Sequence, residues 1–248
     1  MAKSIILKKY DFGEADELVV FLSRELGWLR GIAKNAKRSR VRFGGHLEPL
    51  SLVDLSLRPR KRDDLVWIDE SQVLQGFLPI RSDIRKVAHA QYFLELCSVF
   101  LAEDHPDQVL FDFVLDFLER LETALPNPVR LLLDEIRLLA ILGYGPRFDI
   151  CPLCGKSFER GQGVTFAPNL GGACHPTCVG SNAMRSVPLS PNTLAIVRKG
   201  LEVGSEVAGR LRLNRMGLDE LRLALSAFVR YQRGGEMNSL LFLEQMGL

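Results

Sequence analysis

The stretch ELVVFLSRELGWLRGIA at residues 17–33 decides the fold of the first part of the chain. It contains two apolar runs of strand length, 17–23 and 28–33, joined by the turn-prone residues 25–27. Five short strands separated by turn signals predict a small barrel over residues 1–78. The barrel is of the oligonucleotide-binding (OB) type or the SH3-like type, which strand counting alone does not separate, and we favour the OB type. The other three strand candidates are residues 4–10, 49–57 and 65–68.

A helical pattern replaces the strand pattern at about residue 79. Residues 86–103 and 107–122 are apolar nearly all round, which predicts buried helices. Asn127 suits the N-cap of a third helix, with Pro128 as its first residue and Gly143 as its stop. Two late helices are expected at residues 191–203 and 218–232.

Between these helical segments, residues 149–180 are rich in Gly and Pro and carry four of the five cysteines. Because helices flank this region in sequence, we expect an insertion within one helical domain and not a separate domain. The predicted fold class is therefore α+β. An OB-type β-barrel occupies residues 1–78, and an all-helical domain at residues 79–248 carries the insertion.

The composition is that of a globular chain, with 248 residues, 47% hydrophobic and 25% charged. This apolar content excludes a wholly disordered chain. No uncharged apolar run reaches the ~18 residues of a membrane span. The N-terminus has neither the apolar segment nor the cleavage site of a signal peptide. We therefore expect a cytoplasmic protein that does not associate with membranes.

Positive charge is concentrated in the predicted barrel, although the net charge of the chain is only +2. Residues 26–47 carry six cationic side chains and no acidic one, and a second cluster begins at Arg58. Contacts of Lys and Arg to phosphates dominate nucleic-acid affinity, so both clusters are candidates for nucleic-acid binding. The second is the weaker candidate, because Asp63 and Asp64 adjoin it. The candidate residues are Arg30, Lys34, Lys37, Arg38, Arg40, Arg42, Arg58, Arg60 and Lys61.

Three aromatic residues near these clusters, Trp28, Phe43 and Trp67, offer faces on which bases could stack without regard to sequence. The alternative is that the basic loop is only solvated and that the aromatic rings belong to the core. For Trp67, which lies inside an apolar strand pattern, the core interpretation is favoured.

The cysteines have the spacing of a closed metal site. Cys151 and Cys154 form a Cys-x-x-Cys turn, and Cys174 and Cys178 make a second pair after a gap of 19 residues. Four such ligands saturate a zinc ion and leave no open position, so the predicted Zn²⁺ is structural. Cys174 is the first choice for the third ligand. His175 is the alternative, because two residues separate it from Cys178, as in the first knuckle.

No catalytic residue is predicted. The four histidines are scattered along the chain, and neither a Gly-x-Ser-x-Gly elbow nor a Gly-rich phosphate loop is present. The sequence therefore favours a binding protein over an enzyme.

Three separated motifs form a pattern that spans the chain. They are YDFGEAD at residues 10–16 followed by GIAKNAKRSRVRFGGHLEP at 31–49, LLAILGYGPRFDICPLCG at 138–155, and MNSLLFL at 237–243. In this order and combination, the chain resembles the bacterial RecO-type DNA repair and recombination mediator proteins. It departs from their usual pattern at the second knuckle, where His175 stands in the place of an expected cysteine.

The resemblance implies an OB fold joined to a helical domain with a zinc-binding insertion, and a non-enzymatic role. Such proteins bind single- and double-stranded DNA and anneal complementary strands. They help to load a RecA-type recombinase onto DNA coated by single-strand-binding protein. The implied partners are a RecR-type ring-forming protein and the C-terminal tail of single-strand-binding protein, in a cytoplasmic, nucleoid-associated setting.

The acidic tail of such a partner calls for a hydrophobic groove with a cation beside it. Arg130 and Arg137 lie on one predicted helix together with Leu133, and they are the candidate partner-binding residues. The alternative is that both arginines are only solvated.

Chemistry alone also allows a zinc-containing RNA-binding or transcription-associated module, or a scaffold without a nucleic-acid role. A preference for structured RNA without strand annealing would indicate the first. Absent or salt-insensitive DNA binding would indicate the second.

Overall fold

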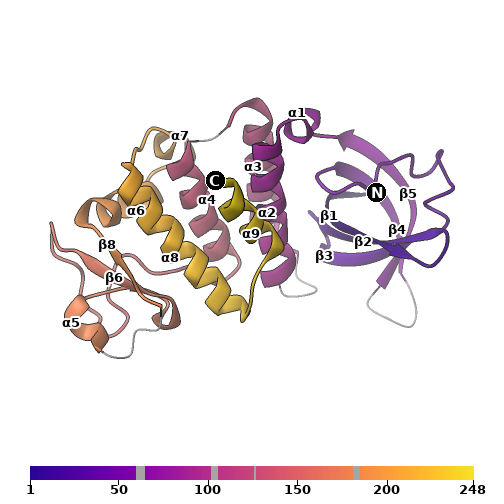
Figure 1. The fold of residues 1–248 in the computed structure, drawn as a ribbon. Helices are drawn as coiled ribbons and strands as arrows, with labels where there is room; N and C mark the ends of the chain where they lie inside the picture. The colour runs from indigo at the N-terminus through magenta and orange to yellow at the C-terminus, as the bar shows by residue number, and fades with distance from the viewer. Residues whose placement is uncertain (60–64, 102–105, 126, 181–184) are drawn as a thin grey trace. The chain divides into compact units, whose positions relative to one another are not determined.

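The computed structural model describes residues 1–59, 65–101, 106–125, 127–180 and 185–248 (Figure 1). By its internal contacts the chain divides into two compact units, Met1–Leu125 with Gln245–Leu248, and Pro126–Glu244. The predicted domain division at residue 78 stays a prediction. Across the described ranges, no helix has both the length and the apolar character needed to cross a bilayer.

The first unit begins with a closed five-stranded barrel. Its strands follow the order β1-β2-β3-β5-β4, and β4 pairs with β1 to close the circle. The pair β3 and β5 is parallel, whereas the other pairs are antiparallel. This confirms the predicted OB-type barrel within an α+β fold. The strands are β1 (Ala2–Phe12), β2 (Asp16–Ser23), β3 (Gly27–Ala33), β4 (Leu52–Pro59) and β5 (Leu65–Gln75).

The barrel core is aliphatic and aromatic, with Ile6, Phe21 and Ile68 among its buried members. Gly31 permits the close approach of β3 to β5, because a Cβ atom there would overlap the Ile68 side chain. Phe43, from the connection between β3 and β4, also belongs to this core. Its burial contributes about 2 kcal/mol and ties the connection to the barrel.

Helices α1 (Leu78–Arg81), α2 (Ile84–Phe100) and α3 (Gln108–Thr123) complete the first unit. Asp83 and Asp107 cap the longer two by accepting backbone N–H donors. The rings of Phe93 and Phe117 stack between α2 and α3 with centroids 3.7 Å apart. Both predicted helices are therefore present; Glu103, the predicted end of the first, lies outside the described residues.

The second unit is built on helices whose ends the sequence predicts well. Asn127 caps α4 by accepting from the backbone N–H groups of Val129 and Arg130. Ser190 caps α6 in the same way through Thr193. The predicted helices are α4 (Pro128–Ile141), α6 (Pro191–Glu202) and α8 (Arg215–Arg233). The structure adds two that the sequence did not predict, α7 (Ser205–Ala208) and α9 (Asn238–Met246).

A small sheet of order β7-β6-β8 occupies the predicted insertion and extends past its predicted end at residue 180, because β8 lies at residues 187–189. These strands are three or four residues long, too short for an alternating apolar pattern to reveal them in the sequence. The described part of the region also contains a 3₁₀ turn and a short helix. The elements are β6 (Val164–Ala167), η1 (Pro168–Leu170), β7 (Gly172–Cys174), α5 (Pro176–Val179) and β8 (Val187–Leu189).

Candidate nucleic-acid interface and metal cluster

The predicted basic loop is the connection between β3 and β4, and it is held at several points. Phe43 and Leu47 are each only 2% exposed and pack into the barrel core. Ser71 on β5 donates its backbone N–H to the Arg42 carbonyl at 3.1 Å. His46 Nδ1 lies 2.8 Å from the Ser71 carbonyl and can donate to it. The loop therefore presents its side chains from a backbone fixed to the barrel.

The cations of this loop fall into two groups. Lys34, Arg38 and Arg40 are exposed, and no ion pair joins Arg38 or Arg40 to an acidic side chain in the described part of the chain. Lys37 is exposed but lies 3.0 Å from a carboxylate oxygen of Asp11. Arg42 is half-buried and donates to the Lys34 carbonyl at 3.0 Å. Phosphate contacts from this loop would thus come first from Lys34, Arg38 and Arg40.

The remaining candidates lie on the strands or outside the described residues. Arg30, on β3, is half-buried with its guanidinium 5.5 Å from the centre of the Trp28 ring. Arg58, on β4, is exposed and donates two hydrogen bonds to the Asp69 carboxylate. Arg60 and Lys61 lie outside the described residues.

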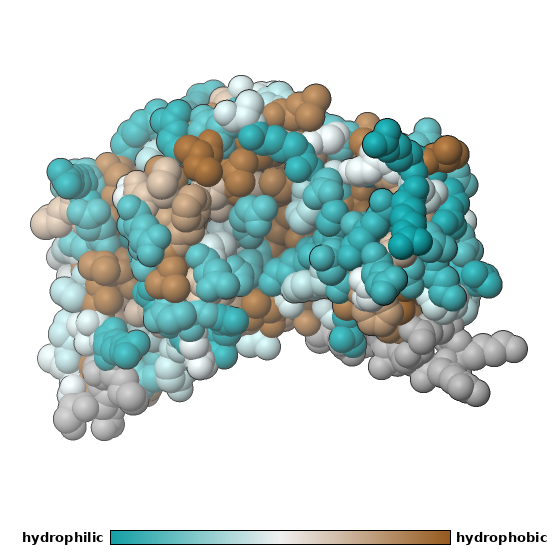
Figure 2. Space-filling model, turned by 45° about the vertical axis from the view of Figure 1, so that its right-hand side comes forward, coloured by the Kyte–Doolittle hydropathy of each residue, from teal (hydrophilic) through white to brown (hydrophobic). Residues whose placement is uncertain are grey.

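Two of the three candidate stacking residues differ from the sequence-based interpretation. Phe43 is buried in the core and presents no face to solvent. Trp67, for which the core was favoured, is only half-buried and lies under the Lys34 ammonium. Hydrophilic side chains predominate on the visible face of the barrel (Figure 2, right). Exposed apolar side chains of the barrel include Tyr10 and Phe12 on the hairpin of β1 and β2.

The insertion of the second unit gathers four metal-ligating side chains. The ligand atoms of Cys151, Cys154, His175 and Cys178 all lie within 4.8 Å of one another. Three thiolates and an imidazole are a common tetrahedral zinc set, so the donor chemistry fits a closed metal site. The imidazole faces the cluster through Nδ1, 3.4 Å from Cys154 Sγ, and its ring packs on Phe158.

The cluster contains His175 and omits Cys174, which was the first choice from the sequence. Cys174 ends β7 in register with Thr165, and the next residue, His175, carries the imidazole that joins the cluster. The Cys174 Sγ donates to the Gly172 carbonyl at 3.7 Å. Burial, with a further contribution from the nearby Cys151 charge, raises the pKa of the Cys174 thiol to about 12. The geometry therefore favours the alternative set with His175.

The surroundings of the Cys151 thiol favour its deprotonated form. Burial alone would raise its pKa, but backbone N–H donors of His175, Cys154 and Leu153 outweigh burial and lower the pKa to about 6. Backbone donors directed at sulfur stabilise the deprotonated form that binds a metal. This electrostatic environment is a second observation that suits a metal ligand.

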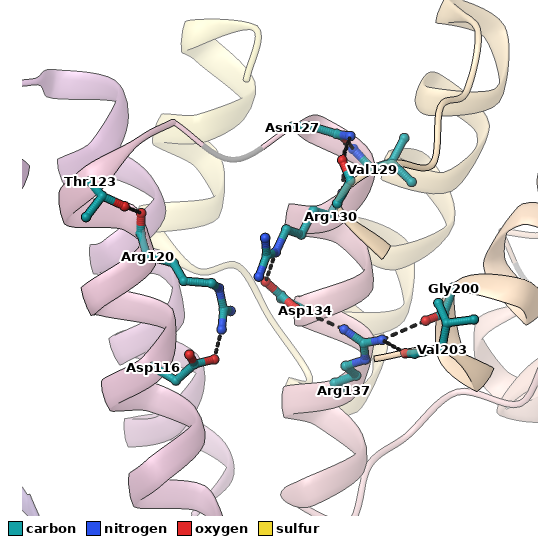
Figure 3. Close-up of polar contacts among 11 residues, drawn as sticks. Asp116, Arg120, Thr123, Asn127, Val129, Arg130, Asp134, Arg137, Gly200 and Val203 are labelled. Carbon is teal, nitrogen blue, oxygen red and sulfur yellow. Dashed lines mark hydrogen bonds and ion pairs between the residues drawn. The ribbon is translucent and has the colours of Figure 1, made fainter. Parts of the chain in front are cut away.

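The two candidate partner-binding arginines are engaged within the second unit (Figure 3). Arg130 and Arg137 approach opposite oxygens of Asp134, at 3.8 and 3.3 Å. Asp134 is only 1% exposed. Arg137 also donates to the Gly200 and Val203 carbonyls at the end of α6. Leu133 is fully buried and does not line an open groove.

The buried partner, Asp134, was missed by the sequence analysis. It stands four residues after Arg130 and three before Arg137, the spacing at which side chains meet on one helix face. That spacing was a readable signal for an internal ion pair. The burial of Asp134, which makes the pair important for stability, could not be predicted from the spacing.

Models of known protein families match most of the chain. A family model described as Recombination protein O N terminal matches residues 1–77, and one described as Recombination protein O C terminal matches residues 81–241. The chain is similar to the "DNA repair protein RecO" of Anaeromyxobacter dehalogenans (strain 2CP-C), with 34% identity over 243 residues. That match covers 98% of this chain and 95% of the relative.

Other relatives agree over the same length. The protein of the same name from Dehalococcoides mccartyi (strain CBDB1) is 34% identical over 246 residues, 99% of this chain and 95% of the relative. That from Myxococcus xanthus (strain DK1622) is 32% identical over 248 residues, 99% of this chain and 97% of the relative. The resemblance seen in the sequence motifs is thereby confirmed. The chain belongs to the RecO family of DNA repair proteins.

Proposed function

We propose that the chain is a recombination mediator that binds single- and double-stranded DNA and anneals complementary strands. It would help to load a RecA-type recombinase onto DNA coated by single-strand-binding protein. Membership in the RecO family supports this role. The observation that carries it is the exposed group Lys34, Arg38 and Arg40 on a connection anchored in the barrel core. None of these steps requires bond chemistry by the chain, so the proposed role is non-enzymatic.

The anchored loop provides a physical route to annealing. Its cations would contact phosphates, which position a strand without reading its bases. Each contact releases counterions, so affinity falls as salt rises. When the phosphates of two strands are neutralised together, their mutual repulsion falls, and complementary strands can approach and pair.

The cysteine and histidine cluster would hold a structural zinc ion. Cys151, Cys154, His175 and Cys178 supply four ligands, which leaves no position for a substrate or an activated water. A bound ion would cross-link the first knuckle to the segment around α5 and so stabilise the insertion. We assign to this cluster a role in folding and to the barrel the role of binding DNA.

The proposed partners are a RecR-type ring-forming protein and the C-terminal tail of single-strand-binding protein, as expected of the family. The ion pairs of Arg130 and Arg137 with Asp134 favour a structural role for these arginines. These internal contacts weaken the case for Arg130 and Arg137 as contacts to an acidic tail.

Annealing of complementary oligonucleotides over a salt series tests the proposal. The expected result is annealing that persists on strands coated with single-strand-binding protein and fades with salt. The double variant Arg38→Ala with Arg40→Ala should anneal more slowly and show a flatter salt dependence of DNA affinity.

Two outcomes would favour other functions. DNA binding without annealing, together with tighter binding of structured RNA, would favour the RNA-binding or transcription-associated module. Absence of DNA binding at low salt would contradict the assignment of the basic loop and favour a scaffold role.

A further inference from the structure

The outer face of β3 and β5 collects an unusual set of side chains. A Cβ atom on Gly31 would overlap the Ile68 side chain, so this position of β3 faces the barrel core. Because strand residues alternate, Trp28 and Arg30 therefore face outward. In β5, Ile68 belongs to the core, so Trp67 also faces outward. The two tryptophans of the chain thus share one outer face of the barrel.

Each indole ring on this face lies beside a cation. The Lys34 Nζ atom is 4.5 Å from the centre of the Trp67 ring. The Arg30 guanidinium is 5.5 Å from the centre of the Trp28 ring. Both distances lie within the range of cation–π attraction, and both rings are only half-buried. The cations therefore hold the rings and also place positive charge beside them.

The strand register spaces the two rings along the sheet. Trp67 lies beside Ile32 in the parallel pair of β3 and β5. Ile32 is four residues beyond Trp28, which separates the two levels by about 13 Å. On its other side Trp67 neighbours Arg58 of β4, whose charge is paired with Asp69. This spacing suits two separate bases of one strand and not one ring sandwiched between both indoles.

We propose that this face, defined by Trp28, Arg30, Lys34 and Trp67, is a stacking platform for unpaired bases of single-stranded DNA. The inference rests on the proposed DNA-binding function and assigns its strand selectivity to a definite surface. Bases stack on aromatic side chains without regard to sequence, whereas paired bases already stack on one another inside the duplex. The basic loop would hold phosphates of either form, and the platform would add affinity only for single strands.

Intrinsic fluorescence gives a direct test, because the chain has two tryptophans and both lie on the platform. Addition of an oligothymidylate of about 20 nucleotides to the 248-residue chain should quench the emission at saturation. A duplex of equal length, bound to saturation at low salt, should quench the emission much less, because its bases stay paired and only a phosphate contact to Lys34 reaches the Trp67 ring. Trp28→Phe and Trp67→Phe each leave one reporter ring, so the two positions can be followed separately.

Affinity measurements supply the second arm. Trp67→Ala should weaken binding of oligothymidylate by about 10-fold and leave duplex affinity within about 2-fold. Trp67→Phe is the matched control, because it keeps an aromatic face and should retain most of the affinity. Arg38→Ala should instead weaken the binding of both single-stranded and duplex DNA. Circular dichroism of each variant establishes that the barrel is folded.

Unchanged tryptophan emission at saturating oligothymidylate would overturn the platform, as would equal losses of single-strand and duplex affinity in Trp67→Ala. Tighter binding of oligouridylate than of oligothymidylate would overturn the assignment to DNA. Failure of the proposed function looks different, because the wild-type protein would then bind neither form of DNA at low salt.

Discussion

Two pairs of arginines, one in the β3–β4 loop and one on α4, lie in opposite environments. Arg38 and Arg40 extend into solvent from an anchored connection. Arg130 and Arg137 converge on a carboxylate that is only 1% exposed. The first pair is available to an external anion, whereas the second already has an internal one. Counts of positive charge therefore identify a binding surface only after burial is known.

Physical chemistry explains why the two environments have different consequences. An exposed cation interacts weakly with its surroundings, so its removal changes stability little. A buried carboxylate that loses its partner keeps the cost of desolvation without the compensating attraction. Substitution of the exposed loop arginines should therefore weaken DNA binding, whereas substitution of the α4 arginines should lower the free energy of unfolding.

Loss of a metal ligand should have the largest effect on stability. His175→Ala removes one of the four clustered ligands, so we expect loss of bound zinc and destabilisation of the second unit on the order of 5 kcal/mol. Metal analysis of the purified protein and urea unfolding measure the two effects. DNA affinity of the barrel should change little.

Cys174→Ser is the matched control for the ligand set. It should retain one zinc ion per chain, because Cys174 lies outside the cluster. Loss of zinc from Cys174→Ser, with retention in His175→Ala, would reverse the ligand assignment.

Removal of Arg137 should have the next largest effect. Arg137→Met deprives Asp134 and the last carbonyls of α6 of a donor, and we expect destabilisation of about 3 kcal/mol in urea unfolding. Adding Asp134→Leu removes the buried charge as well, so the double variant should recover part of the loss. A stable Arg137→Met protein that binds an acidic tail peptide more weakly would instead favour the partner-binding role.

The packing of α4 on α6 gives a third, smaller effect. A Cβ atom at Gly200 would overlap the Leu133 side chain, so Gly200→Ala should destabilise the protein by about 2 kcal/mol. Combination with Leu133→Val should relieve part of the overlap in thermal unfolding. Strictly additive losses in the double variant would show that the two positions do not interact.

Removal of the exposed cations should change stability least. Arg38→Ala with Arg40→Ala should alter the free energy of unfolding by no more than about 0.5 kcal/mol. The slope of log affinity for duplex DNA against log salt should fall by about 2, since each lost phosphate contact contributes about 0.9. An unchanged slope would exclude both residues as phosphate contacts. The loop arginines would then be no more available to DNA than the paired arginines of α4.

Local sequence signals determined much of the fold. Short apolar runs with turns between them predicted the five barrel strands, and Asn127 and Ser190 marked helix starts that the structure confirms. These features depend on neighbours in sequence, through capping donors and alternating side chains. The Cys-x-x-Cys spacing likewise indicated a metal-binding knuckle at Cys151 and Cys154.

Only the tertiary structure decided what several single residues do. It buried Phe43, left Trp67 half-buried beneath Lys34, and enclosed Asp134 between two arginines. It also brought the His175 imidazole together with the thiols of Cys151, Cys154 and Cys178. Each of these outcomes depends on contacts between distant segments, whose burial and orientation no local pattern encodes.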